Sequence, residues 1–150
     1  MPKLQQVFPV KKPVIGMVHI QYRRGIELQK LIDSTLHDME ALQNCGIDGL
    51  IFENWGLEYS SPNVKKDESS YLCKVIDVAR RKARVPYGIN ILPLDIYLDS
   101  ILAGAYEANF VHIDTFVDTV KTDYESCLVL HPHSKGIRHD LRNHFLMTNV

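Results

Sequence analysis

Four short apolar runs that contain or end in polar residues constrain the fold more than any other feature of the chain. In the clearest run, residues 47–55, an apolar stretch stops abruptly at Glu53 and Asn54. Strands buried on both faces are continuously apolar, and α/β proteins gather their chemistry at the carboxyl ends of such strands. The pattern therefore predicts buried parallel strands with a shared polar rim. The other three runs are residues 14–19, 87–92 and 110–114.

Amphipathic helical patterns separate these runs. After residue 26, apolar side chains recur at intervals of three and four, which predicts an amphipathic helix. Gly46 is expected to end this helix. Lys11, Lys12 and Pro13 predict a solvated lead-in without helix just before the first strand. The remaining predictions are helices over residues 26–45, 67–84 and 95–106, a weaker helix over 134–143, and a fifth strand over 145–150.

Alternating strands and helices predict a single α/β domain with a parallel sheet over residues 1–150. The strand starts at residues 14, 49, 87 and 110 are 35, 38 and 23 residues apart. These intervals bracket the roughly 31 residues that each unit of a (β/α)₈ barrel occupies. The pattern fits either a partial TIM barrel or a five-stranded doubly wound parallel sheet.

Composition excludes several classes of partner. The 17 Lys and Arg residues balance 18 Asp and Glu, so no basic excess exists to attract nucleic acid. No apolar run approaches the roughly 20 residues of a transmembrane helix, and the amino end lacks a signal-peptide core. The three cysteines form no Cys-x-x-Cys pair, which favours reduced thiols. We therefore expect a cytoplasmic protein without a transmembrane segment.

Four motifs resemble, in order and spacing, those of the BtpA/SgcQ family. They occupy residues 12–19, 46–54, 85–92 and 109–114, and the resemblance extends to Thr122 and Asp123. The resemblance implies a TIM barrel, of which this chain would form four βα units and the start of the fifth strand. The domain would then be incomplete at its carboxyl end relative to a full barrel. Leu94-Asp95 replaces the family's usual Asn-Asp, and His112 replaces an arginine.

The strand ends of such a barrel converge on one mouth and supply the candidate site. Glu53 or Asp114 would transfer a proton, and His19 would protonate a departing oxygen. Each of these polar groups has an alternative interpretation as part of a hydrogen-bonded layer that caps the strands. His112 shares the face of Asp114, but a single histidine inside a strand is more often a core residue. The predicted substrate-binding residues are Asn54, Asn90, Trp55, Asp95 and Asp123.

The sequence leaves cofactors open. It contains no nucleotide-binding motif, and we assign no metal ligands. Glu53, Asp114 and His19 are nevertheless ligand types that a divalent cation accepts. Trp55 directly follows the Glu-Asn pair and offers a ring platform for a sugar.

The strand-end residues and the resemblance together leave three functions open, which the sequence does not separate. The first is binding of a small hydroxylated or phosphorylated metabolite, with acid/base chemistry of the lyase, aldolase or isomerase type. The second is a non-catalytic assembly factor for a membrane complex, of the photosystem I biogenesis type. The third is an inactive, truncated family member. The open edges of a partial barrel also predict a homo-oligomer that covers them, or a fragment of a longer protein.

Overall fold

The computed structural model describes residues 4–55, 66–91, 96–113, 120–121, 129–130 and 145–148. Its elements are α1 (Leu4–Val7), β1 (Ile15–Gln21), α2 (Leu28–Asn44), β2 (Gly49–Trp55), α3 (Lys66–Arg80), β3 (Tyr87–Asn90), α4 (Ile96–Ala105), β4 (Phe110–Ile113), β5 (Val120–Lys121), β6 (Val129–Leu130) and β7 (Phe145–Thr148). The three main helices, four strands and fifth parallel strand predicted from the sequence are confirmed. The helix predicted over residues 134–143 lies outside the described residues.

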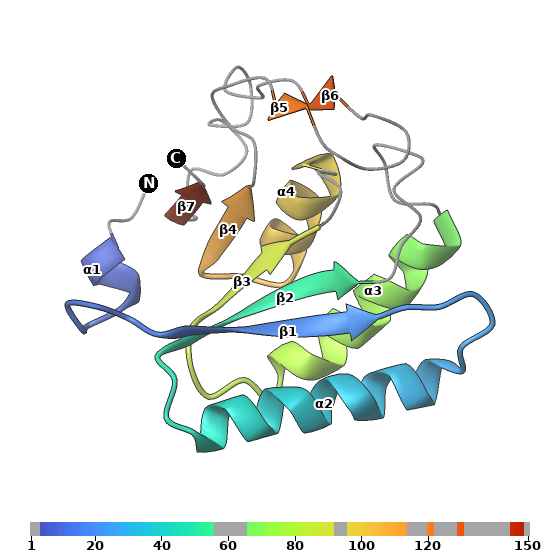
Figure 1. Ribbon diagram of the computed structural model, residues 1–150, viewed down its shortest axis with the longest axis horizontal. Helices are drawn as coiled ribbons and strands as arrows, with labels where there is room; N and C mark the ends of the chain where they lie inside the picture. The colour runs from blue at the N-terminus through green and yellow to red at the C-terminus, as the bar shows by residue number, and fades with distance from the viewer. Residues whose placement is uncertain are drawn as a thin grey trace.

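The five-stranded sheet has the order β1-β2-β3-β4-β7, and every neighbouring pair is parallel. The helices α2, α3 and α4 lie along one face of this sheet (Figure 1). A doubly wound sheet reverses its strand order and carries helices on both faces, whereas a barrel keeps the chain order. The fold is therefore a partial (β/α)₈ barrel.

Two apolar clusters hold the sheet, one on each face. The helix-side core contains alternate strand residues such as Val18 and Phe52, packed against Leu31 of α2 and Leu72 of α3. This arrangement follows from the two-residue period of a strand and the wide apolar stripes of the helices. The opposite face, which we call the inner face, is covered at its amino end by the second cluster, centred on Phe8, Ile51 and Phe110.

Ahead of the lead-in, residues 4–8 form an element that the sequence did not predict. The short helix α1 is followed by Phe8, whose side chain is fully buried, and its ring meets Phe110 edge-on at a centroid distance of 5.4 Å. The prolines at 9 and 13 restrict only their own surroundings, where the chain is not helical. The segment is ordered because the amino end of the inner face needs an apolar cover.

The antiparallel pair of β5 and β6 was not predicted. Each of these strands has two residues, joined by the pairs Val120–Leu130 and Lys121–Val129. A two-residue strand is too short to show the alternation by which strands are recognised in a sequence. No helix in the described part of the chain is long and apolar enough to cross a membrane.

Close packing of β3 on β4 makes a strong prediction for Gly88. A Cβ atom there would lie 2.2 Å from Cε2 and 2.3 Å from Cδ2 of Phe110, whose ring is fully buried. We expect Gly88→Ala to lower the free energy of unfolding by about 1–3 kcal/mol, because the ring must shift within a filled core. Urea denaturation followed by circular dichroism measures this loss.

Gly104 provides the matched control. It lies in α4, and an added Cβ would meet nothing within 4 Å. Gly104→Ala should leave stability unchanged or raise it by up to about 1 kcal/mol, because alanine favours a helix. Equal effects of the two substitutions would contradict the packing described for Gly88.

Candidate functional site

Four polar side chains form a row across the inner face at the carboxyl ends of the strands. His19 of β1 is in register with Glu53 of β2, and Glu53 is in register with Asn90 of β3. Paired residues of neighbouring strands share a face, so these side chains lie side by side. His112 of β4 joins them, because its Nδ1 atom lies 2.7 Å from Asn90 Nδ2. We call these four residues the inner row.

Glu53 and His19 place a carboxylate next to an imidazole within the inner row. Glu53 Oε1 lies 4.0 Å from His19 Nε2, and the Glu53 side chain is only 5% exposed while that of His19 is 39% exposed. Burial keeps the carboxylate from being fully hydrated, and the imidazole lies close enough to share a bound group with it. The geometry suits an acid and a base acting on one ligand.

Trp55 extends the row toward the rim. It is in register with Gln21 and therefore lies on the same face as His19 and Glu53. Its ring stacks on His19 with centroids 4.8 Å apart and an interplanar angle of 28°. Trp55 is 47% exposed, so part of this aromatic surface is open to solvent. Such a surface can hold the apolar face of a sugar ring.

Asn90 is the buried amide of the row. It is 2% exposed, and its Oδ1 atom has no hydrogen-bond partner among the described residues. A buried amide oxygen without a partner is costly unless a ligand or water completes it. The histidine beside it, His112, was not selected from the sequence as a site residue. Its alternation with Asp114 was the one signal that pointed to the rim.

The structure does not bring all the predicted residues together. Asn54 is in register with Ile20, which belongs to the helix-side core, so Asn54 lies on the face opposite Glu53 and is itself buried. Adjacent strand residues necessarily alternate between faces. Asp114, Asp95 and Asp123 lie outside the described residues. Within the described residues, no group of three His, Cys, Asp or Glu side chains is arranged to hold a metal ion.

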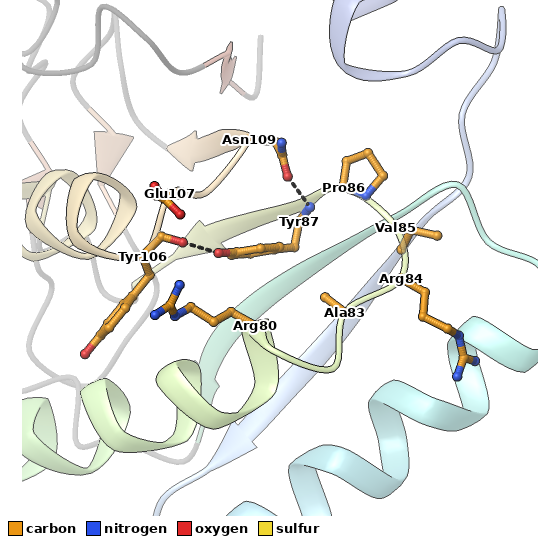
Figure 2. Close-up of a pocket in the computed structure, with 9 residues that line it drawn as sticks. All are labelled: Arg80, Ala83, Arg84, Val85, Pro86, Tyr87, Tyr106, Glu107 and Asn109. Carbon is orange, nitrogen blue, oxygen red and sulfur yellow. Dashed lines mark hydrogen bonds between the residues drawn. The ribbon is translucent and has the colours of Figure 1, made fainter.

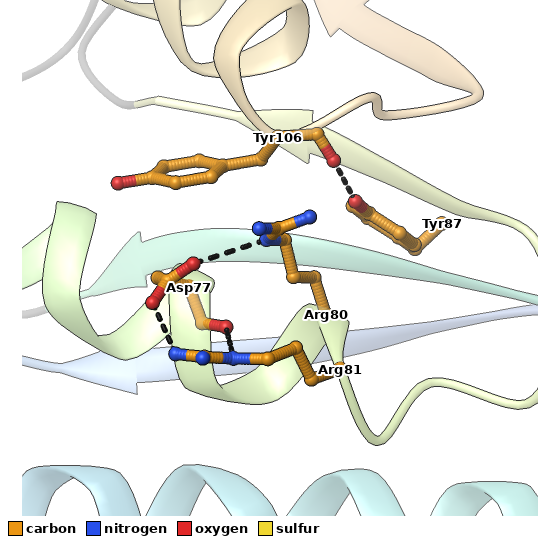
Figure 3. Close-up of polar contacts among 5 residues, drawn as sticks. All are labelled: Asp77, Arg80, Arg81, Tyr87 and Tyr106. Carbon is orange, nitrogen blue, oxygen red and sulfur yellow. Dashed lines mark hydrogen bonds and ion pairs between the residues drawn. The ribbon is translucent and has the colours of Figure 1, made fainter.

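A cavity of about 420 Å³ lies at the opposite end of the strands, lined by the segments that precede β3 and β4 (Figure 2). The Tyr87 backbone N–H donates to Asn109 Oδ1 at 3.0 Å, and the Tyr87 hydroxyl donates to the Tyr106 carbonyl. The Arg80 guanidinium lies 5.3 Å from the Tyr106 ring centroid and binds Asp77 (Figure 3). These groups bind one another across α3, β3 and α4. We therefore assign this end to stability, as in other barrels.

Tyr87 makes stability depend on pH at this end. Burial raises the pKa of the Tyr87 phenol above its ordinary value of 10.0, against a smaller lowering by Arg80. Its stabilising contribution is thus complete below about pH 10 and is lost as the pH rises through the folded-state pKa. Tyr87→Phe should cost about 0.5–1.5 kcal/mol at pH 8 through the lost hydrogen bond. The difference in the free energy of unfolding between the wild-type protein and Tyr87→Phe, measured in urea, should be smaller at pH 11 than at pH 8. An equal difference at both pH values would contradict the stabilising role of the Tyr87 hydroxyl.

Sequence comparison identifies relatives along most of the chain. Residues 10–131 match the sequence model of the BtpA family. A Pyrococcus horikoshii protein, PH1209, is 31% identical over 117 residues, which cover 75% of this chain and 45% of that protein. The Escherichia coli putative sgc region protein SgcQ is 28% identical, covering 76% of this chain and 50% of SgcQ. The photosystem I biogenesis protein BtpA of Synechocystis is also 28% identical, covering 80% and 44%.

Structural comparison agrees with the barrel topology. The 7,8-dihydropteroate synthase of Vibrio fischeri superposes with a TM-score of 0.65, covering 91% of this chain and 44% of the enzyme. The sequence identity is 10%, so this likeness shows the fold alone. The chain spans about half the length of the curated relatives it matches.

Proposed function

Because this chain belongs to the BtpA family, we propose that its inner row binds a small hydroxylated or phosphorylated metabolite at the carboxyl ends of the strands. One observation carries the proposal, namely the buried Glu53 carboxylate 4.0 Å from the His19 imidazole on the inner face. In TIM-barrel enzymes this end of the strands holds the active site. The exposed ring of Trp55 beside His19 supplies an apolar surface for a ring or carbon chain.

The proposed chemistry is proton transfer of the lyase, aldolase or isomerase type. Glu53 would take a proton from a carbon or hydroxyl of the substrate, and His19 would deliver one to the departing or carbonyl oxygen. Asn90 would orient a hydroxyl or carbonyl through its buried amide. Asp114 is proposed as a second acid, because it follows β4 directly. Asp95 and Asp123 are proposed as further substrate contacts beyond the described strands.

A thermal-shift screen of neutral sugars, phosphosugars and divalent metals tests the proposal. A compound that binds the inner row should raise the melting temperature, because binding only the native state adds stability in proportion to ligand saturation. Trp55→Ala should weaken the best sugar several-fold, since an aromatic contact contributes on the order of 1 kcal/mol. Undiminished binding to that variant would remove Trp55 from the site.

A second candidate, an assembly factor for a membrane complex, has support from one relative. The Synechocystis relative is named a photosystem I biogenesis protein, and its match covers 80% of this chain. Such a factor would act through its surface, and the buried Glu53 carboxylate would have no part in it. Co-purification of a membrane complex, unchanged by Glu53→Gln, would favour this candidate over metabolite binding.

A further inference from the structure

We propose that Asn90 fixes the tautomer of His112, with the ring proton on Nε2, and that this pair selects a neutral hydroxyl of the ligand over an anionic group. The inference rests on the proposed function, because it assumes that the inner row binds a ligand. It adds to that function a tautomer and a chemical class of ligand that the register of Glu53 and His19 does not supply. The two halves of the proposal, tautomer and selectivity, follow from separate atoms of the Asn90 amide.

The tautomer follows from the contact between Asn90 Nδ2 and His112 Nδ1 at 2.7 Å. An amide nitrogen can only donate, so Nδ1 must present its lone pair and carry no proton. A neutral imidazole has one proton, which therefore resides on Nε2. Protonating the ring would bring an N–H of His112 against an N–H of Asn90. The contact thus fixes the tautomer of the neutral ring.

Among the described residues, the hydrogen bond with Asn90 is the contact of His112 on which the tautomer rests. On the inner face, β2 contributes Glu53 and β1 contributes His19, which lie two and three strands away from β4. The sequences of β7, Phe-Leu-Met-Thr, and of α1, Leu-Gln-Gln-Val, contain no titratable residue. α4 packs on the other face, where Asp99 Oδ1 accepts the Ile91 N–H at 2.8 Å.

The selectivity follows from the other atom of the same amide. One N–H of Asn90 Nδ2 donates to His112 Nδ1, and the Oδ1 atom of the same amide is a buried acceptor without a hydrogen-bond partner among the described residues. A ligand hydroxyl can donate to that oxygen and accept from an imidazole N–H, whereas a phosphate or carboxylate can only accept. An anionic ligand group in the inner row would also be repelled by the nearby Glu53 carboxylate. The inner-face residues of β1–β4 include no lysine or arginine to offset that charge.

Nuclear magnetic resonance of the protein without ligand tests the tautomer. Nitrogen–proton correlations of the imidazole rings at pH 8 should show His112 protonated on Nε2, with exposed His37 of α2 as the internal reference. In Asn90→Asp, the carboxylate can only accept a hydrogen bond, so the His112 ring should carry a proton on Nδ1. A wild-type Nδ1–H tautomer, or an Nδ1 that stays without a proton in a folded Asn90→Asp variant, would overturn this half.

Paired ligands test the selectivity. Neutral monosaccharides and their phosphate esters are compared by calorimetry on the wild-type protein, and the neutral form of each pair should bind at least several-fold tighter. Asn90→Leu should reduce that binding tenfold or more. Tighter binding of the phosphate esters to the wild-type protein would refute the selectivity. Unchanged affinity of the neutral sugars for both Asn90→Leu and His112→Ala would refute it too. In either case, ligand binding that is lost in Glu53→Gln would still support the proposed function. If no compound binds the wild-type protein, the proposed function and the selectivity fail together. The tautomer is then tested only by the nuclear magnetic resonance of the protein without ligand.

Discussion

Glu53→Gln is expected to abolish the activity proposed for this chain while leaving its fold intact. Glutamine keeps the size of the side chain and removes the charge and the basicity of a residue that is only 4% exposed. A positioned general base typically contributes about 10²–10⁴-fold to a rate, so turnover of any substrate found should fall by that factor. Because the glutamine amide keeps the size of the side chain and one acceptor oxygen, the melting temperature without ligand should change little.

The control for this substitution is Glu40→Gln. Glu40 lies exposed on α2, on the helix side of the sheet, so the same chemical change there should alter neither turnover nor stability. Steady-state kinetics and thermal unfolding of the three proteins separate loss of chemistry from loss of fold. Wild-type turnover in Glu53→Gln would eliminate Glu53 as the acid/base residue.

Phe8→Ala is expected to produce the largest loss of stability of any single substitution considered. The Phe8 ring is fully buried against Phe110, and its Cε1 atom lies 2.6 Å from the position of a Cβ built on Gly49. Removing such a ring leaves a cavity at the amino end of the inner face. The free energy of unfolding should therefore fall by about 3–5 kcal/mol.

Val10→Ala is the matched control for Phe8→Ala. Val10 lies two residues later in the same segment, and its side chain is 38% exposed. Its truncation should change stability by no more than about 0.5 kcal/mol. Chemical denaturation of both variants measures the difference. A loss below 1 kcal/mol for Phe8→Ala would show that α1 and Phe8 do not cover the sheet in solution.

The sequence predicts the barrel well because its dominant signals are local. Burial of one or both faces produces apolar runs in β1 to β4 and amphipathic periods in α2 and α3. These local patterns are sufficient to recognise the elements in the sequence. Strand order was not predictable from those periods, since a barrel and a doubly wound sheet use the same elements. Only the pairing of β7 with β4, and of each strand with the next in the chain, decides between them.

The sequence predicted that polar residues gather at the strand ends, but not which of them contact one another. Glu53 and Asn90 were both expected at strand ends, and register places them together. Asn54 was grouped with them, although the alternation of a strand assigns it to the helix side. His112 was set aside because a histidine within a strand is usually structural, and its contact with Asn90 depends on tertiary pairing. Phe8 was missed because nothing local reveals which surface a short lead-in covers.

Ligand binding at the inner row can be observed through its histidines. The imidazole resonances of His19, His112 and His37 are recorded while the sugar or phosphosugar with the largest thermal shift is added. We expect the signals of His19 and His112 to move with the binding curve, while that of His37, exposed on α2, stays in place. Saturable binding that leaves His19 and His112 unmoved would contradict ligand binding at the inner row.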